Sequence, residues 1–247
     1  MRAMVLAAGD GTRLGPLTRL MAKPMVEVAG RPAIGWIASW LCEHGVREMV
    51  VNLRRHPETL LAYLRDGREL GITTRFSLEH EVIGTGGALR EAAGLLGDRF
   101  VLTYGDVLTD MNLGGLIAAH LENPAQPCLT LSLIRTDRPT ECGIASQGSD
   151  GRIVRFVEKP LASDVFSDWA NAGIMVIERR VLDFIPAGGF CDLSSEVVPA
   201  LIDAGERVWG YRMSASDYLI DMGTPALLER ARQTWPTERF LAHSAGR

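Results

Sequence analysis

Apolar residues in the N-terminal part of the chain fall into short runs that alternate with segments of helical spacing. Residues 3 to 8 form an uninterrupted apolar run that stops at a glycine cluster, as a buried parallel strand does. A helical face follows, made by Ile34, Ile37, Trp40 and Leu41. Gly45 is placed to end that helix before a strand predicted over residues 46 to 53. The pattern predicts a β-α-β unit.

The same alternation continues as far as residue 104. Pro57 stands where a second helix could begin, and residues 72 to 78 alternate apolar and polar positions as a strand does. A glycine-led segment over residues 86 to 96 then precedes an apolar run at residues 100 to 104. Helices that alternate with short strands indicate an α/β fold with a mostly parallel sheet covered on both faces.

The pattern changes after residue 124, where strands become more frequent. Strands are predicted over residues 128–135, 152–157, 172–177, 208–213 and 218–220. Helices are predicted near residues 180–186 and 194–204, and Thr224-Pro225 predicts the start of a last helix. Repeats and linkers are absent from the sequence, so we expect one domain over residues 1–235 with substrate-facing insertions in its second half and a tail over residues 236–247.

Composition and charge narrow the class of protein. The chain has 47% hydrophobic and 23% charged residues, as ordinary globular proteins do, and a net charge of -4 without a basic cluster, which argues against nucleic acid as a partner. Apolar runs are too short for a membrane span or a secretion signal. The cysteines, which are scattered, form no C-x-x-C pair: Cys42, Cys128, Cys142 and Cys191. We therefore expect a cytoplasmic protein without zinc or disulfides.

The glycine cluster after the first strand, V-L-A-A-G-D-G-T-R-L-G-P-L-T, allows a dinucleotide site or a phosphate site. A dinucleotide fingerprint requires a third glycine, where this chain has Leu14, and an acid at the end of the second strand, which here reads Val51-Asn52-Leu53. Both departures weaken the interpretation as an NAD-dependent oxidoreductase. Glycines that expose backbone N–H groups, together with Arg13 and Lys23, suit the phosphates of a nucleotide instead.

The string L-A-A-G-D-G-T-R-L-G-P-L-T, followed by A-K-P at residues 22 to 24, resembles the signature of the sugar-1-phosphate nucleotidyltransferase family. Further motifs appear in that family's order over residues 1 to about 235. They are E-V-I-G-T-G-G-A-L at residues 81–89, Y-G-D at 104–106, F-V-E-K-P at 156–160, N-A-G at 171–173 and Y-L-I-D-M-G-T-P at 218–225. The resemblance implies a Rossmann-like three-layer αβα sandwich with a mostly parallel mixed sheet.

The resemblance also implies roles for individual residues. Nucleotide-binding residues would be Leu6, Ala7, Ala8, Gly9, Gly11, Thr12, Arg13, Glu81, Gly84, Thr85, Gly86 and Gly105. Contacts to the sugar phosphate would come from Gly143, Glu158, Lys159 and Asn171. Asp106 and Asp221 would hold Mg²⁺, a hard cation that prefers oxygen ligands.

The implied reaction joins a nucleoside triphosphate to a sugar 1-phosphate and releases pyrophosphate. Since a phosphate monoester is already a nucleophile, charge neutralisation and positioning by Arg13, Lys23, Asp106, Lys159 and Asp221 should suffice without a general base. Chemistry of this kind needs no histidine. The histidines, which lack metal-ligand spacing, are therefore expected to be structural or surface residues: His44, His56, His80, His120 and His243.

The G-T-G-G-A-L form of the second motif most resembles members that use GTP with mannose or manno-heptose 1-phosphate. Uridylyl or thymidylyl transfer, a cyclitol phosphate substrate and a non-catalytic paralogue that only binds a nucleotide sugar stay open, as does a homodimer formed through the apolar helices. Four positions depart from the family pattern, namely Asp10, Gly15, Ala22 and Cys142. Asp10, an acid within a phosphate loop, should repel a triphosphate unless it points away or helps to hold a metal. A C-terminal β-helix of hexapeptide repeats, which some members carry, is not expected.

Overall fold

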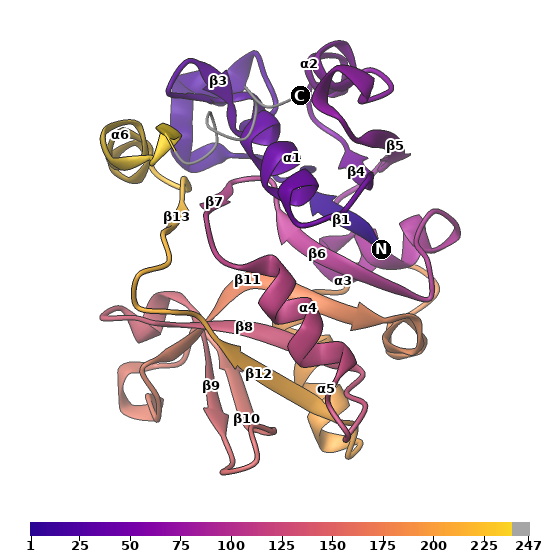
Figure 1. Ribbon diagram of the computed structural model, residues 1–247, viewed down its shortest axis with the longest axis vertical. Coiled ribbons are helices and arrows are strands. Elements are labelled where there is room, and N and C mark those ends of the chain that lie inside the picture. Colours follow the sequence, from indigo (N-terminus) through magenta and orange to yellow (C-terminus); the bar gives the residue numbers. More distant parts are fainter. Residues whose placement is uncertain (239–247) are drawn as a thin grey trace. The chain divides into compact units, whose positions relative to one another are not determined.

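The computed structural model describes residues 1–238 and divides into two compact units that are interleaved along the sequence (Figure 1). Among the described residues, unit 1 comprises Met1–His80, Thr103–Met111 and residues 217–238, and unit 2 comprises Glu81–Leu102 and Asn112–Ser216. The expectation of a single domain over residues 1–235 stays a prediction. Most of the expected tail, residues 239–247, and His243 lie outside the described residues.

The strands of unit 1 confirm the β-α-β pattern. Strands β1 (Arg2–Leu6), β4 (Glu48–Leu53) and β5 (Thr73–Leu78) pair in parallel in that order, with Val5 opposite Val51 and Val51 opposite Phe76. Helices α1 (Ala33–Glu43) and α2 (Pro57–Leu64) connect them, and α2 begins at the predicted proline. Because parallel neighbours end at one edge of a sheet, the segments that follow β1, β4 and β5 lie together.

Smaller elements complete unit 1. Two short antiparallel pairs join β2 (Glu27–Val28) to β3 (Arg31–Pro32) and β7 (Val107–Thr109) to β13 (Leu219–Asp221). Helix α6 (Pro225–Thr234) starts where the Thr224-Pro225 signal predicts, and the Thr224 hydroxyl accepts the N–H of Leu227.

Unit 2 is built on a mixed sheet with mostly antiparallel pairs. Strands β10 (Ile153–Glu158), β9 (Gly143–Gln147), β11 (Trp169–Glu178) and β6 (Arg99–Tyr104) are neighbours in that order, and β6 carries the chain on into unit 1. Strand β8 (Leu129–Arg135) pairs with β11 in antiparallel and with β12 (Val208–Arg212) in parallel orientation.

Helices cover the sheet of unit 2. Helix α4 (Leu113–Leu121) packs on β8, β11 and β12, and α5 (Val198–Asp203) packs on β10 and β12 (Figure 1). Helix α3 (Gly84–Glu91) begins inside the second glycine motif. The predicted helix near residues 180–186 is a 3-10 turn over Arg179–Phe184. Apolar side chains that are fully buried, such as Phe100, Leu102 and Ile174, form the core.

The sequence patterns missed several elements. Helix α4, strands β7 and β9 and the β2–β3 pair were not predicted. These strands have two to five residues, so an alternating or apolar run is too short to stand out from its flanks. As for helices in the described residues, none is long and apolar enough to cross a membrane.

Candidate active site

The glycine loop of unit 1 leaves the end of β1 and turns through a left-handed residue. Gly11 has φ +61°, and a Cβ atom there would lie 2.8 Å from Cγ2 of Thr18, so both conformation and space require glycine. Gly9 has open space around it. Within residues 1–238, the backbone N–H groups of residues 8 to 11 donate no hydrogen bond to the protein. Four amide groups of the predicted phosphate loop are therefore free to meet an anion.

Pairing between β7 and β13 brings two predicted metal ligands together. Asp221 lies opposite Val107 in this antiparallel pair, and the N–H of Met222 donates to the carbonyl of Asp106 at 2.9 Å. Residues more than a hundred positions apart in sequence thereby become neighbours. The predicted convergence of the Asp106 and Asp221 segments is a feature of unit 1 alone.

Lys23 lies between these two carboxylates. Its ammonium group forms an ion pair with Oδ2 of Asp106 and lies 3.8 Å from Oδ1 of Asp221. The Lys23 side chain is 10% exposed, that of Asp106 21% and that of Asp221 51%. The Lys23 ammonium group therefore bridges two negative charges in a partly buried place.

The pKa of Asp221 depends on neighbouring charges of both signs. Burial and the neighbouring Asp106 carboxylate raise the pKa of Asp221, whereas Lys23, Arg13 and the N–H of Gly223 oppose the increase. Arg13 approaches from the glycine loop, since a Cβ atom on Gly223 would lie 2.9 Å from its Nη2 atom. Arg13, Lys23, Asp106 and Asp221 are thus brought together as predicted.

The donor set suits a magnesium ion. Two carboxylates supply only oxygen ligands, the kind that a hard cation such as Mg²⁺ prefers. Within residues 1–238, no group of three or more His, Cys, Asp or Glu side chains is arranged to hold a metal. Mg²⁺ is commonly bound through one or two carboxylates, with water and substrate phosphates as the other ligands, so the pair fits this cation.

Asp10 does not face the phosphate loop as an uncompensated acid. Its carboxylate forms an ion pair with Arg54 and lies 3.5 Å from Nη1 of Arg55. Two guanidinium groups accompany one carboxylate, so the net charge of this group is positive. The repulsion that the sequence predicts for a triphosphate is therefore offset by residues that follow β4.

The second glycine motif, in unit 2, is held by the segment around Cys191. The N–H groups of Gly86 and Gly87 donate to the carbonyl of Cys191 at 2.9 and 3.1 Å. Thr85 donates its hydroxyl to Oδ2 of Asp192 at 2.9 Å and accepts the N–H of Leu193 at 2.7 Å. A Cβ atom on Gly84 would lie 2.3 Å from the carbonyl oxygen of Cys191, which explains the glycine.

These contacts show what holds the second glycine motif in place, and the nucleotide-binding role of its residues stays a prediction. The Thr85 hydroxyl and the Gly86 N–H serve the internal structure of unit 2, while Glu81 at the start of the motif is exposed. The sequence does not predict that Cys191 and Asp192 hold this motif, because a lone C-D pair between predicted helices is a weak local signal. The one sequence signal near this pair is the Gly188-Gly189 dipeptide, which predicts a turn just before it.

The predicted sugar-phosphate residues lie on three neighbouring strands of unit 2. Glu158 ends β10, Gly143 begins β9 directly opposite it, and Asn171 lies on β11. A Cβ atom on Gly143 would lie 2.5 Å from Oε2 of Glu158, so glycine makes room for that carboxylate. Lys159 has φ +46°, is exposed and lies 3.5 Å from Oε1 of Glu158.

The environment of Glu158 is partly buried. Burial raises the pKa of its carboxyl group, Lys159 opposes this and the Asp192 carboxylate adds to it. Asp192 is therefore close enough to influence Glu158 while it also binds Thr85. In contrast, the side chain of Asn171 accepts the N–H of Gly173 at 3.0 Å, which shapes the N-A-G bulge of β11.

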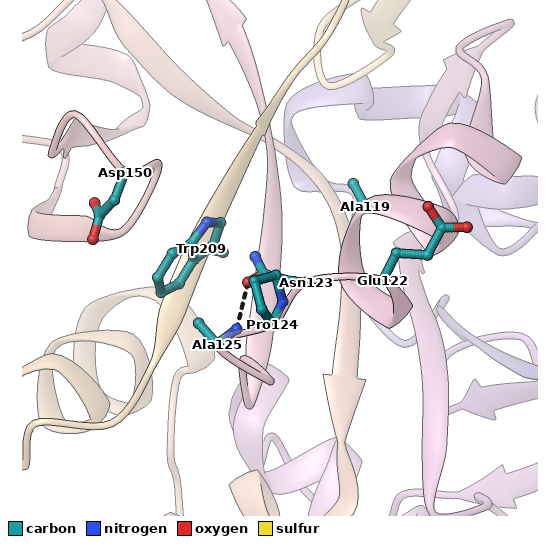
Figure 2. A pocket seen from close by; sticks show the side chains of 7 residues that line it. All are labelled: Ala119, Glu122, Asn123, Pro124, Ala125, Asp150 and Trp209. Atoms are coloured by element: carbon teal, nitrogen blue, oxygen red, sulfur yellow. Dashed lines mark hydrogen bonds between the residues drawn. The ribbon is translucent and has the colours of Figure 1, made fainter.

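A separate groove of about 520 Å³ in unit 2 contains none of the predicted site residues (Figure 2). Its lining consists of Ala119, Glu122, Asn123, Pro124, Ala125, Asp150 and Trp209. Figure 2 shows the Trp209 side chain beside the short turn at Asn123, whose side chain is hydrogen-bonded to the N–H of Ala125. The groove brings together no set of catalytic groups.

Comparison with known proteins decides the family. A sequence model of the nucleotidyl transferase family matches residues 2–237. This chain belongs to the nucleotidyl transferase family. Its mixed α/β fold agrees with that of a putative glucose-1-phosphate thymidylyltransferase from Bacillus anthracis, with a TM-score of 0.85, 22% identity and 94% of each chain covered.

Other nucleotidyl transferases are similar in sequence or fold. A mannose-1-phosphate guanylyltransferase from Mycobacterium tuberculosis is 37% identical over 225 residues, 90% of this chain and 61% of the relative. A UTP–glucose-1-phosphate uridylyltransferase from Synechocystis is 32% identical, over 86% of this chain and 58% of that protein. HddC from Yersinia pseudotuberculosis, complexed with GMP-PN, has a TM-score of 0.77 at 21% identity, with 94% of this chain and 98% of HddC covered. The chain thus spans about three fifths of the length of these curated relatives.

Proposed function

We propose that this nucleotidyl transferase joins a nucleoside triphosphate to a sugar 1-phosphate, with release of pyrophosphate. The observation that carries the proposal is the β7–β13 pairing, which gathers Asp106, Asp221 and Lys23 in the unit whose glycine loop has free amides. Family membership supports the same reaction class.

The residues present fit an in-line displacement at the α-phosphorus. An oxygen of the sugar phosphate attacks, the bond to the pyrophosphate oxygen breaks, and the electron pair leaves with pyrophosphate. Arg13 and the loop amides would bind the triphosphate, and Lys159 would orient the sugar phosphate. A phosphate monoester dianion needs no proton removed, so positioning and charge neutralisation are the main contributions of the protein.

Magnesium is proposed as the cofactor, held by Asp106 and Asp221. When bound, it would act as a Lewis acid on a phosphoryl oxygen and offset the charge of two anionic substrates. Lys23 would keep the two carboxylates at their spacing and add a positive charge beside them.

GTP and a mannose-type sugar 1-phosphate are the proposed substrates. Greater identity to the mycobacterial guanylyltransferase, 37% against 32% for the cyanobacterial uridylyltransferase, favours GTP, as does the G-T-G-G-A-L sequence of α3. Uridylyl transfer to a hexose 1-phosphate is the second candidate, because the uridylyltransferase matches over nearly as much of the chain. A heptose or cyclitol phosphate remains a further choice of acceptor.

A cytoplasmic location and a homodimer are also proposed. All four cysteines are free, as expected in a reducing compartment that supplies nucleoside triphosphates. Sedimentation of the purified protein at several concentrations would test the dimer.

The decisive experiment measures pyrophosphate release over a matrix of ribonucleoside triphosphates, dTTP and several sugar 1-phosphates with Mg²⁺. Asp106→Asn and Asp221→Asn should each lower turnover by about 10³-fold, since a bound metal contributes several kcal/mol. Asp137→Asn is the matched control, because the Asp137 side chain is 98% exposed and outside the site. If no pair reacts while a nucleotide sugar binds tightly, the chain is a non-catalytic paralogue.

A further inference from the structure

Three backbone groups at the start of the glycine loop are held by two other segments of unit 1, one directly after β6 and one at the end of β4. The carbonyl of Leu6 accepts the N–H of Gly105 at 2.8 Å, directly before Asp106. The N–H of Ala7 donates to Oδ1 of Asn52 at 2.6 Å, and the carbonyl of Ala8 accepts Nε of Arg54 at 3.2 Å. The peptide groups that lead into the free amides are thus fixed from the buried side of the loop.

Asn52 does not act alone. Its Nδ2 atom donates to Oε1 of Glu79 at 2.6 Å, and the two residues are 3% and 7% exposed. Asn52 lies one residue before the end of β4, and Glu79 follows β5 with its N–H bound to the carbonyl of Leu53 at 2.8 Å. Ala7, Asn52 and Glu79 therefore form a buried chain of hydrogen bonds, here called the relay.

The direction of the relay follows from its two ends. The backbone N–H of Ala7 can only donate and the Glu79 carboxylate can only accept, so the Asn52 oxygen faces Ala7 and its NH₂ group faces Glu79. A leucine at position 52 could satisfy neither neighbour, and an aspartate could satisfy both only if Glu79 took up a proton. A buried polar group that loses its partner is costly, so the relay holds one peptide orientation firmly.

We propose that Asn52 and Glu79 are positioning residues for the triphosphate. Because the Ala7 N–H is hydrogen-bonded to Asn52, it does not contact the phosphates. The fixed Ala7 peptide directs the free amides of residues 8 to 11 toward the anion. This inference rests on the proposed function of the loop, and it assigns nucleotide affinity to two side chains that do not touch the nucleotide.

An exchange of the two functional groups tests the relay. In Asn52→Asp, two buried carboxylates face each other. In the double variant Asn52→Asp/Glu79→Gln, the carboxylate at position 52 accepts from both the Ala7 N–H and the new amide at position 79, which restores both hydrogen bonds of the relay. Asn123→Asp is the matched control, because Asn123 also accepts a backbone N–H, that of Ala125 at 2.9 Å, which a carboxylate can do equally well.

Two readouts are compared for each variant: the equilibrium binding and KM of the triphosphate, and hydrogen exchange of the amides in residues 7 to 11. Asn52→Asp should weaken triphosphate binding and raise KM about tenfold or more, with a much smaller change in kcat, and should speed exchange in the loop. The double variant should recover both properties. Should Asn52→Asp fail to fold, Asn52→Ala removes the same acceptor without opposing charges and should have the same two effects.

Unchanged loop exchange and triphosphate affinity in the folded position-52 variants, or no recovery in the double variant, would overturn the relay. A failure of the proposed function has a different signature. In that case the parent protein binds no triphosphate, while loop exchange still follows the integrity of the relay.

Discussion

The Nζ atom of Lys23 lies 3.8 Å from Oδ1 of Asp221. The same ammonium group forms an ion pair with Asp106. Lys23 and Lys159 are the only lysines in a chain with 26 lysine and arginine residues together. Both lie in predicted anion or metal sites. A compact ammonium group suits the narrow space between two carboxylates, whereas the planar guanidinium group of arginine is larger and requires a forked geometry.

Removal of this charge should destabilise the protein in a way that magnesium corrects. Lys23→Met leaves two carboxylates facing each other and should lower the free energy of unfolding by about 1–3 kcal/mol without metal, less than for a fully buried pair. Thermal unfolding in EDTA and in Mg²⁺ checks this: Mg²⁺ should raise the Tm of the variant more than that of the parent. Lys23→Arg should also lose most turnover. An equal Mg²⁺ effect in variant and parent would contradict the proposed metal pair.

Two glycines of the phosphate loop offer a matched pair of substitutions. Gly11→Ala should lower the free energy of unfolding by about 1–2 kcal/mol, because the residue has φ +61° and its new Cβ would lie 2.8 Å from Thr18. Gly9→Ala should change stability by less than about 0.5 kcal/mol, since nothing lies within 4 Å of its Cβ. Urea unfolding gives both values.

The same pair separates folding from binding. If phosphate approaches the loop backbone, Gly9→Ala should still raise KM for the triphosphate, since a methyl group would stand between the amides and the anion. Normal kinetics in this stable variant would place the triphosphate elsewhere.

The Thr85 hydroxyl should matter for the second glycine motif, and its methyl group should not. Thr85→Val leaves the N–H of Leu193 and one oxygen of Asp192 without this partner, which should cost about 1–3 kcal/mol. Thr85→Ser keeps both hydrogen bonds and should stay within about 1 kcal/mol of the parent. Chemical denaturation compares the two, and equal losses would show that packing of the methyl group dominates.

His120 should make the fold sensitive to mild acid. Its ring nitrogens contact Oγ1 of Thr130 at 2.8 Å and Oε1 of Glu178 at 3.0 Å, and burial lowers its pKa despite the nearby carboxylate. The unfolded chain has a histidine pKa near 6.5, so below that pH it binds a proton that the folded chain binds more weakly. The free energy of unfolding should therefore fall with pH below about 6.5, by at most about 1.4 kcal/mol per pH unit for this group.

The control for this pH effect is His120→Gln, which does not titrate. As the pH falls from about 7 to about 5.5, the free energy of unfolding of the parent should decrease more than that of the variant. His44, whose pKa burial also lowers, is present in both proteins and cancels in the comparison. Parallel pH profiles would show that His120 is not responsible.

Local patterns in the sequence were sufficient to predict much of the fold. The start of α2 at Pro57 and of α6 at Pro225 was predicted correctly because a proline fits the first turn of a helix. Helix α4 was missed: its sequence L-G-G-L-I-A-A-H-L contains two glycines that weaken a helical signal, and the cap at Asn112 shows only when its side chain is seen to accept the N–H of Gly115.

The candidate site was predictable where motifs carry it and not where distant side chains complete it. Asp106, Asp221 and Lys23 were named from their motifs, and their proximity is now seen within one unit. The roles of Asn52, Glu79, Arg54 and Arg55 depend on which strands are neighbours, so no local pattern predicts them. In the sequence, Asn52 indicates only that the second strand lacks the acid of a dinucleotide site. The structure gives it a place beneath the phosphate loop.

The β7–β13 pair also imposes an order of events on biosynthesis. During translation, the glycine loop, Lys23 and Asp106 leave the ribosome long before β13. A nascent chain that ends before residue 219 lacks Asp221, so Lys23 has only the Asp106 carboxylate of this pair as a partner. Proteolytic loss of the segment from β13 onward would recreate that immature state in a finished protein. Binding of the proposed Mg²⁺ would then report that translation had passed this strand and that the strand had paired with β7.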